Sequence, residues 1–447
     1  MRLLTAFTTL LGVATAAPSM DIRDTGKFSV ARPGKVKDMQ ITEDNTLNGT
    51  YHGKDTVVHM AKVQTANGSQ PFEFVNNFPG GQVNAYIVGL DSQERVVFLG
   101  GDGSLIYPSS GGSEVPVAVK ENIKIPMPAQ GSNFKISLPI PMHSGRIYFS
   151  EGELTFAMVK TATGDGLVQP AVTDLNDPSA GTNWGFVELT VNPDGSIYAN
   201  ISYVDFIGMI LSMQLTTTDG SAPQITKGLD SNAVTEVCNG LNDQGNSDGR
   251  PWAKMCIANA QGQPLRVLSP NDYSVIDSTS FEDYWNDYVN QVWTKYAAEP
   301  LVINSQTGAG NVNCHVDGDQ LNCDGDNRPY DKPTAKDIWG CDSGPFGKIG
   351  QENDIHLAVI PRLCAGFVRT TLLMDGGATQ PSLAATSYYT NQPTNHYSRL
   401  IHEHEIDGKG YAFAYDDVNP DGNENASGVV SSGSPDTLTV YIGAPPA

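Results

Sequence analysis

The sequence predicts a mainly β protein that carries an α/β section within it. From about Gln70 to Gln214, short apolar runs such as "VNAYIVGL", "FKISLPI" and "FVELTV" are separated by Gly, Pro, Asn and Asp turns, which is typical of an antiparallel sandwich or barrel. The later stretch "STSFEDYWNDYVNQVWTKYAAEP" repeats its apolar residues at helical spacing. Strand-like runs return after residue 408 in "GYAFAYDD" and "TLTVYIG". We therefore predict a β domain over 70–225 and 409–447, and a disulfide-containing α/β domain over 226–408.

The N-terminus predicts export from the cell. A short apolar run, Leu3 to Val13, is followed by the small residues Ala14-Thr15-Ala16, which is the pattern of a secretory signal peptide over 1–16. No other stretch is apolar over the roughly 18 residues that a membrane span needs. We expect a secreted, soluble protein that starts near Ala17. Residues 17–69 form a polar, weakly patterned extension to which the sequence assigns no role.

The cysteines agree with an oxidising destination. There are six, at positions 238, 256, 314, 323, 341 and 364, and an even number in a secreted chain predicts disulfides. Their pairing stays open, except that we expect a Cys314–Cys323 bridge to close the predicted loop "NVNCHVDGDQLNCDGDNRPYDKP". Sequons at Asn48, Asn67, Asn200 and Asn425 permit glycosylation.

Two helices are expected in the α/β section. Thr279 and Glu282 have capping-box spacing, which predicts a helix that starts there, runs through Tyr296 and ends before Pro300. Its aromatic residues are predicted to lie in the core. A second helix is predicted from Pro361 to about Leu373, with the proline in its first turn.

Charge limits the classes of ligand. The formal net charge is -22, and nucleic acid requires a basic surface to neutralise its phosphates. An acidic, lysine-poor protein suits a neutral polymer instead. We therefore expect neither nucleic acid nor a membrane as a partner.

The stretch "NWGFVELTVNPDGSIYANISYVDFIG", residues 183–208, predicts a β-hairpin. The turn "NPDG" favours a three-residue loop with a bulge at Gly195. Val191 then pairs with Ile197 and Leu189 with Ala199, so one face is apolar. The other face is a polar stripe flanked by aromatic residues: Phe186, Glu188, Thr190, Asn192, Tyr198, Asn200 and Ser202.

Asp205 departs from this alternation. Strict alternation would bury its carboxylate at a cost of several kcal/mol, so we predict a bulge or strand end between Ser202 and Asp205 that returns it to the face of Glu188. Side-chain lean and strand twist could then bring the two carboxyl groups to the ~6.5–9.5 Å that an inverting glycosidase uses. The alternative is that both acids are ordinary exposed strand residues.

The pieces "FVELTVN" and "NISYVDFIG" resemble an element of the thaumatin-like fold, and more closely its counterpart in glycoside hydrolase family 64, the thaumatin-like β-1,3-glucanases. Further resemblances are "FEFVNNFPGGQVNAYIVGLD", "SGRIYFSEGELTF", "GQPLRVLSP", "WGCDSGPF" and "GKGYAFAYDDV". Their order covers roughly residues 70 to 443. Asn200 departs from the thaumatin-like pattern, which usually has aspartate there.

This resemblance implies a thaumatin-like β-sandwich or barrel domain beside an α/β domain, with a wide acidic groove between them that accepts β-1,3-glucan. It implies an inverting endo-β-1,3-glucanase that releases short laminari-oligosaccharides. We expect the enzyme to act without a cofactor and as a monomer. Glu188 matches the general acid and Asp205 the general base, roles that require their pKa values to differ. The implied substrate-binding residues are Thr190, Asn192, Tyr198, Asn200, Ser202, Asp416 and Asp417. A glycan on Asn200 would block the groove, so we expect Asn200 to be unmodified.

The sequence gives weaker evidence for other kinds of functional site. The histidines of "HEHE", 402–405, could face a metal but lack the H-E-x-x-H spacing, and we expect an exposed strand or loop. The segments "DVNPDG" and "DGDQLNCDGDN" resemble parts of calcium loops but are better explained as a turn and a disulfide-closed loop. Trp339 or Tyr415 could stack on glucose rings.

Two other functions remain open. A thaumatin-like glucan-binding protein without catalysis would use the same groove and similar acids. A secreted defence or inhibitor protein would require a protein partner. The presence of both Glu188 and Asp205 favours the enzyme.

Overall fold

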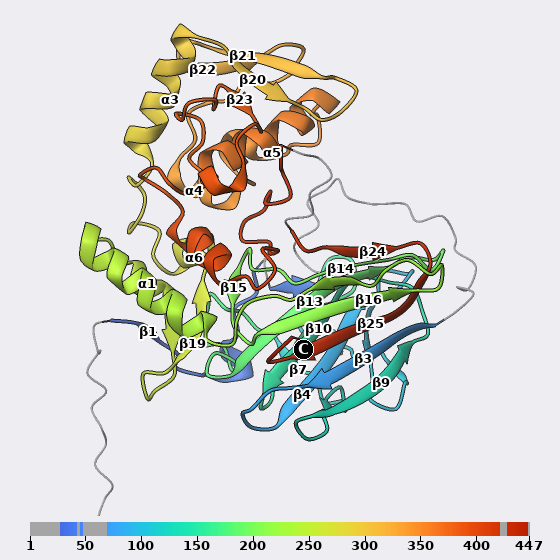
Figure 1. The fold of residues 1–447 in the computed structure, drawn as a ribbon. Helices are drawn as coiled ribbons and strands as arrows, with labels where there is room; N and C mark the ends of the chain where they lie inside the picture. Colours follow the sequence, from blue (N-terminus) through green and yellow to red (C-terminus); the bar gives the residue numbers. More distant parts are fainter. Residues whose placement is uncertain (1–26, 43–44, 48–68, 421–426, 446–447) are drawn as a thin grey trace, which may run out of the picture.

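The computed structural model describes residues 27–42, 45–47, 69–420 and 427–445. The predicted signal peptide, the sequons at Asn48, Asn67 and Asn425, and the end of "DVNPDG" lie outside these residues. In Figure 1 the long strands occupy one part of the molecule, and helices α3, α4 and α5 with a small sheet occupy another. The mainly β expectation is confirmed.

Two large sheets form the β part. The eight-stranded sheet has the order β24 (Val430–Ser432), β14 (Ile197–Asn200), β13 (Asn183–Val191), β10 (Met142–Glu151), β4 (Val83–Leu90), β5 (Val96–Leu99) and β6 (Leu105–Ile106), with β8 (Ile125–Pro126) paired to β4. The five-stranded sheet has the order β17 (Gln224–Thr226), β16 (Leu211–Thr217), β25 (Pro435–Ile442), β3 (Gln70–Asn76) and β9 (Ser132–Leu138).

These sheets enclose a shared apolar core. Phe74 of β3 meets Phe149 of β10 edge to face, with ring centroids 5.1 Å apart. The C-terminal strand β25 lies between β16 and β3 (Figure 1), antiparallel to the first and parallel to the second. The strand predicted at "TLTVYIG" is therefore confirmed, and it returns the chain to the sheet that contains β3.

The helical part follows β17. It contains α1 (Ala233–Asp248), α2 (Pro270–Ile276), α3 (Asn286–Ala298), α4 (Ala335–Gly340), α5 (Asp354–Val368) and α6 (His396–His404), and the sheet β22 (Gln320–Cys323), β21 (Asn311–Asp317), β20 (Leu301–Asn304) and β23 (Thr379–Gln380). Trp285 and Tyr296 of this part are fully buried, as predicted. Trp339 is also in this core, 5% exposed and packed on Trp285, so it is not placed to stack on a sugar.

Two small sheets attach the N-terminal segment. One has the order β1 (Ser29–Val30), β18 (Cys256–Ala258), β19 (Pro264–Leu268) and β15 (Phe206–Ile207). The other has the order β2 (Thr46–Leu47), β12 (Asp165–Val168), β11 (Ala157–Lys160) and β7 (Val117–Ala118). Short 3-10 helices complete the described elements: η1 (Val36–Asp38), η2 (Trp252–Met255), η3 (Gly344–Phe346) and η4 (Ala385–Ser387).

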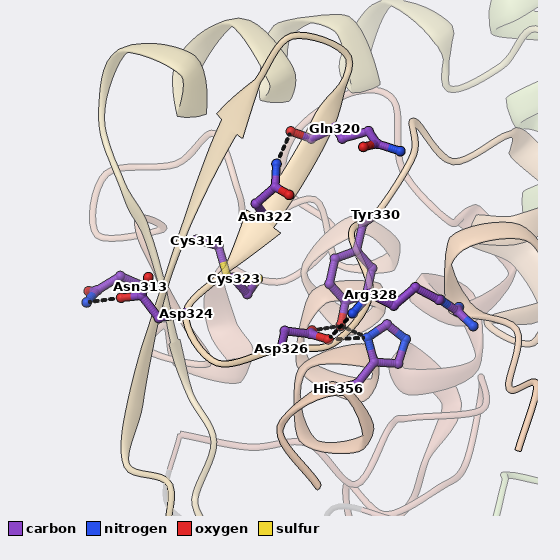
Figure 2. The surroundings of a disulfide bond; sticks show 10 residues. All are labelled: Asn313, Cys314, Gln320, Asn322, Cys323, Asp324, Asp326, Arg328, Tyr330 and His356. Atoms are coloured by element: carbon purple, nitrogen blue, oxygen red, sulfur yellow. Dashed lines mark hydrogen bonds and ion pairs between the residues drawn. A yellow bond between two sulfur atoms is a disulfide. The ribbon is translucent and has the colours of Figure 1, made fainter. Parts of the chain in front are cut away.

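All six cysteines form disulfides: Cys238–Cys256, Cys314–Cys323 and Cys341–Cys364. The predicted Cys314–Cys323 bridge is confirmed, but it joins the paired strands β21 and β22 of a hairpin (Figure 2), where a loop was predicted. The chain after β22 is fixed to α5 by Asp326, which accepts a hydrogen bond from the Tyr330 hydroxyl at 2.7 Å and pairs with His356 Nδ1 at 2.8 Å.

Three predicted helix boundaries are wrong: both helices start elsewhere, and α5 ends at Val368, where the prediction had about Leu373. Helix α3 begins at Asn286, because the Thr279 hydroxyl donates to Asp277 Oδ1 at 2.9 Å and the chain turns before the helix starts. Helix α5 begins at Asp354, where the Asn353 side chain accepts from the His356 N–H at 2.9 Å. Pro361 therefore lies inside α5, whose buried apolar residues maintain the helix around it.

Two further expectations are also corrected, namely an exposed strand or loop at "HEHE" and a strand at "GYAFAYDD". "HEHE" forms the end of helix α6 and the residue after it, because Asn395 caps this helix and its buried residues Tyr397 and Ile401 fix its inner face. Residues 410–417 form turns and one isolated bridge at Tyr411, because the Asp416 carboxylate accepts the N–H of Ala412 at 2.8 Å and folds the segment back. None of the helices within the described residues is long and apolar enough to cross a membrane.

Candidate active site

The hairpin of β13 and β14 has the predicted register. Glu188 lies opposite Asn200, and Leu189 lies opposite Ala199. The Asn192 N–H donates to the Ser196 carbonyl at 2.8 Å, and Gly195 takes a φ of +86°, a left-handed conformation that glycine adopts without steric cost. The local turn therefore sets which side chains share the polar face.

Pairing in β14 stops at Asn200, and the chain bends at Val204 and Asp205. This confirms the predicted interruption before Asp205. The Asp205 carbonyl accepts the N–H of Ser269 at 2.7 Å, which fixes the bend against the helical part. Glu188 and Asp205 consequently line the same groove, whose volume is about 680 Å³.

Arg146 of β10 holds the carboxylate of Glu188. It lies directly opposite Glu188 across the strand pair, donates to Glu188 Oε1 at 3.0 Å, and covers the ring of Phe186 at 4.5 Å from its centroid. On the other side, Asn200 Nδ2 lies 3.4 Å from Glu188 Oε2. Burial disfavours the charged guanidinium, but Tyr148, Glu188 and Asp205 together raise the pKa of Arg146.

A second residue layer supports Arg146. The Tyr148 hydroxyl accepts a long hydrogen bond of 3.4 Å from Arg146 and donates to Gln169 Oε1 at 2.6 Å. Tyr148 is fully buried, and burial raises the pKa of its hydroxyl while Arg146 opposes that increase. The hydroxyl therefore stays protonated at neutral pH and orients the arginine.

Several parts of the chain complete the groove. Its lining contains three of the predicted binding residues, Thr190, Tyr198 and Asn200. It also contains residues that we did not single out from the sequence: Asn45, Thr46, Leu47, Arg146, Gln169, Asn271, Asp272 and Asp342, among others. Two of these residues lie in segments that resemble the family: Arg146 in "SGRIYFSEGELTF" and Asp342 in "WGCDSGPF". The resemblance could therefore have pointed to them.

Four predicted binding residues are absent from this lining. Asn192 donates to Ser196 at the hairpin turn, and Ser202 forms an isolated bridge with Tyr411. Asp417 is exposed outside the groove. Asp416 is 2% exposed. The prediction placed Asp416 on a strand facing the cleft, but the turns of residues 410–417 send its carboxylate into the interior.

Asp416 belongs to a buried charge cluster. Its Oδ1 lies 2.9 Å from Arg369, and its Oδ2 lies 3.0 Å from His402 Nε2. The other ring nitrogen of His402 lies 3.0 Å from Glu405. Burial lowers the pKa of His402, but the two carboxylates outweigh it and raise that pKa to about 10. His402 therefore acts as a cation between two acids.

The described residues contain no cluster of three His, Cys, Asp or Glu side chains arranged to hold a metal ion. His402 is used by Asp416 and Glu405, and His404 Nδ1 lies 2.7 Å from Asp230. The histidines of "HEHE" thus have carboxylate partners from within the chain.

Comparison with known proteins gives a consistent result. The family model described as β-1,3-glucanase, glycoside hydrolase family 64, matches residues 68–442. The glucan endo-1,3-beta-glucosidases of Cellulosimicrobium cellulans and Arthrobacter sp. (strain YCWD3) are 30% and 31% identical to this chain over 310 residues. These alignments cover 65% of this chain and 53% of each relative, so the chain spans about half the length of the curated relatives it matches.

Solved structures agree with this match. A laminaripentaose-producing β-1,3-glucanase in complex with laminaritetraose has a TM-score of 0.72 and 30% identity, over 84% of this chain and 98% of that one. A β-1,3-glucanase domain from Clostridium beijerinckii has the same fold at a TM-score of 0.64 and 19% identity, over 85% and 99% of the two chains. The family match covers most of the 447 residues, and the chain therefore belongs to glycoside hydrolase family 64, the β-1,3-glucanases.

Proposed function

We propose that this protein is an endo-β-1,3-glucanase that binds β-1,3-glucan in the groove and releases short laminari-oligosaccharides with inversion. The observation that carries the proposal is the presence of Glu188, Asp205 and Arg146 in one groove. Membership of the family supports it, as do the curated relatives named glucan endo-1,3-beta-glucosidase and the 30% identical structure that holds laminaritetraose.

In the proposed mechanism Glu188 is the general acid and Asp205 the general base. Asp205 takes a proton from a water molecule while the oxygen of that water bonds to the anomeric carbon. The glycosidic bond breaks on the opposite face, and Glu188 gives its proton to the leaving oxygen. Arg146 and Asn200 fix the orientation of the Glu188 carboxyl group. Tyr198, 54% exposed on the same face, offers an aromatic surface to a glucose ring.

The test is hydrolysis of linear β-1,3-glucan, with the anomer of the product followed by NMR. The unmodified protein should release α-anomer, and Glu188→Gln should lose at least about 100-fold in rate, the usual contribution of general acid catalysis. Asp194→Asn is the matched control, because it makes the same chemical change at the exposed hairpin turn. Release of β-anomer would overturn inversion, and tight binding without hydrolysis would indicate a non-catalytic glucan-binding protein.

A second substrate separates the roles of the two acids. An aryl laminari-oligosaccharide with a good leaving group needs no proton donor, so Glu188→Gln should recover activity on it while Asp205→Asn should not. The reverse result would exchange the two assignments.

We also propose that the protein is secreted and acts as a monomer. Three disulfides support an oxidising compartment. N-terminal sequencing of protein recovered from culture medium tests the proposed secretion, and a chain that starts near Ala17 is the expected result. In the groove, Asn200 contacts Glu188, so the same material should carry no glycan on Asn200.

A further inference from the structure

The N-terminal segment, described over residues 27–42 and 45–47, precedes the part of the chain that matches the family model. Its last three described residues, Asn45, Thr46 and Leu47, nevertheless line the groove together with Glu188 and Asp205. We propose that this segment forms a substrate-binding wall of the groove and that Leu47 contacts a glucose ring of the bound glucan. This inference rests on the proposed function and adds a specificity-determining residue to it.

The segment is anchored at both of its ends. At one end, β1 pairs with β18, and the Ala31 N–H donates to the Ala258 carbonyl at 2.9 Å. At the other end, Thr46 and Leu47 of β2 pair with β12. Between them, the Arg32 N–H donates to the Leu175 carbonyl at 2.7 Å. The segment is therefore held by backbone hydrogen bonds both before and after residues 169–173, the groove lining that follows β12.

Asn45 gives the wall a fixed shape. Its side-chain oxygen accepts the Thr42 N–H at 2.8 Å, and its amide donates to the Gln40 carbonyl at 2.7 Å. Its backbone carbonyl accepts the N–H of Gln169 at 2.8 Å. Gln169 in turn accepts from Tyr148, which contacts Arg146 beside the catalytic carboxylate. The wall and the catalytic residues are thus connected through one chain of hydrogen bonds.

Strand alternation identifies Leu47 as the side chain that reaches the sugar. Thr46 lies opposite Val168, which packs in a small buried cluster with Met39 and Val159. Leu47 lies opposite Leu167 and is therefore on the other face. Leu167 is 0% exposed, whereas Leu47 is only partly buried and lines the groove. Its apolar side chain offers a surface against which the C–H face of a glucose ring can pack.

The decisive experiment measures laminarihexaose binding by calorimetry in the Glu188→Gln background, which prevents turnover. Leu47→Ala removes the apolar contact and should weaken binding about fivefold, as expected for partial loss of buried methyl groups. In the otherwise unmodified enzyme the same change should raise KM for β-1,3-glucan by a similar factor and leave kcat within about twofold. Val36→Ala is the matched control, because Val36 packs in the same segment but outside the groove.

A second variant protects the test against misfolding. Leu47→Trp keeps an apolar side chain on Leu167 but adds bulk in the groove, so it should also weaken hexaose binding and change the lengths of the released products. If both Leu47 variants bind laminarihexaose as tightly as the parent, the proposed contact between Leu47 and glucan is wrong. An equal loss of affinity in Val36→Ala would also contradict it. If the unmodified enzyme releases no oligosaccharide from glucan, the proposed function fails instead.

Discussion

At the scale of single residues, the contacts of Arg146 explain why the Glu188 side chain is held in one orientation. A guanidinium can contact a carboxylate and a hydroxyl at once while its flat face covers an aromatic ring, which a lysine ammonium cannot do. Arg146 makes these contacts with Glu188, Tyr148 and Phe186. The nearby carboxylates also offset the cost of taking its charge out of water.

His402 leads to a prediction about pH. Its ordinary pKa is near 6.5, and Asp416 and Glu405 raise it to about 10 against the effect of burial. Because the folded-state pKa is the higher one, the stability from the charged ring is complete below about pH 6.5 and is lost as pH rises toward 10. We expect His402→Gln to lower stability by about 3 kcal/mol at pH 6.5, since it removes the cation from buried Glu405 and leaves Asp416 with Arg369 alone. The difference from the parent should shrink by pH 9.

Thermal unfolding at several pH values checks this. His404→Gln is the control, because it makes the same substitution in the same helix where the partner, Asp230, has a side chain that is 40% exposed, and an ion pair this exposed contributes little to stability. A His402→Gln variant that differs from its parent by the same amount at pH 6.5 and 9 would show that the ring is not charged in the fold.

Sequence reasoning predicted part of the groove lining, namely the residues whose placement depends on one local turn. Glu188, Thr190, Tyr198 and Asn200 share a face because the "NPDG" turn sets the register of one hairpin, and all four line the groove. Arg146 was not singled out, because its place opposite Glu188 depends on the pairing of β10 with β13, far apart in the sequence. Asp416 was misplaced because the expected strand alternation does not occur there.

At the scale of elements, two disulfides should have different effects. Cys341–Cys364 joins the end of α4 to α5, and its neighbours Gly340 and Asp342 line the groove. Replacing both cysteines by serine should cost about 3 kcal/mol from the unfolded-state entropy of a loop of this length, and it should also raise KM. The double serine variant of Cys314–Cys323 should cost roughly 2–3 kcal/mol and leave KM unchanged, since its hairpin contributes nothing to the described groove lining.

Melting temperatures and glucan kinetics of the two double variants separate these effects. An unchanged KM in both, with lowered melting temperatures, would mean that the edge at Gly340 and Asp342 does not contact glucan. A raised KM in the Cys314–Cys323 variant would instead mean that the distant hairpin supports the groove.

The helix boundaries show where local signals fail. Thr279 and Glu282 have the spacing of a capping box, but the Thr279 hydroxyl donates its hydrogen bond to Asp277, and the helix begins only at Asn286. Pro361 suggested a helix start, but α5 begins at Asp354 and continues through the proline. In the first case a hydrogen bond between neighbouring side chains competes with the capping box, and in the second the Asn353 cap starts the helix well before the proline.

At the scale of the whole molecule, the groove is assembled from distant parts of the chain. Asn45 to Leu47, the β10 and β13–β14 strands, Asp272 and Asp342 all contribute to it. The C-terminal strand β25 lies between β16 and β3 in the five-stranded sheet (Figure 1). The sequence predicts such elements one by one, but their convergence depends on long-range strand pairing, which no local pattern specifies.

The net charge of -22 leads to the last prediction. Like charges repel one another in the compact state, and salt screens this repulsion. Raising NaCl from about 10 mM to about 200 mM should therefore increase the melting temperature by roughly 2–4 °C. A neutral glucan has no charge for the acidic groove to repel, so KM should change by less than about twofold over the same range. A KM that falls tenfold with salt would mean that the groove repels its substrate, and the true substrate would then be an anionic polymer.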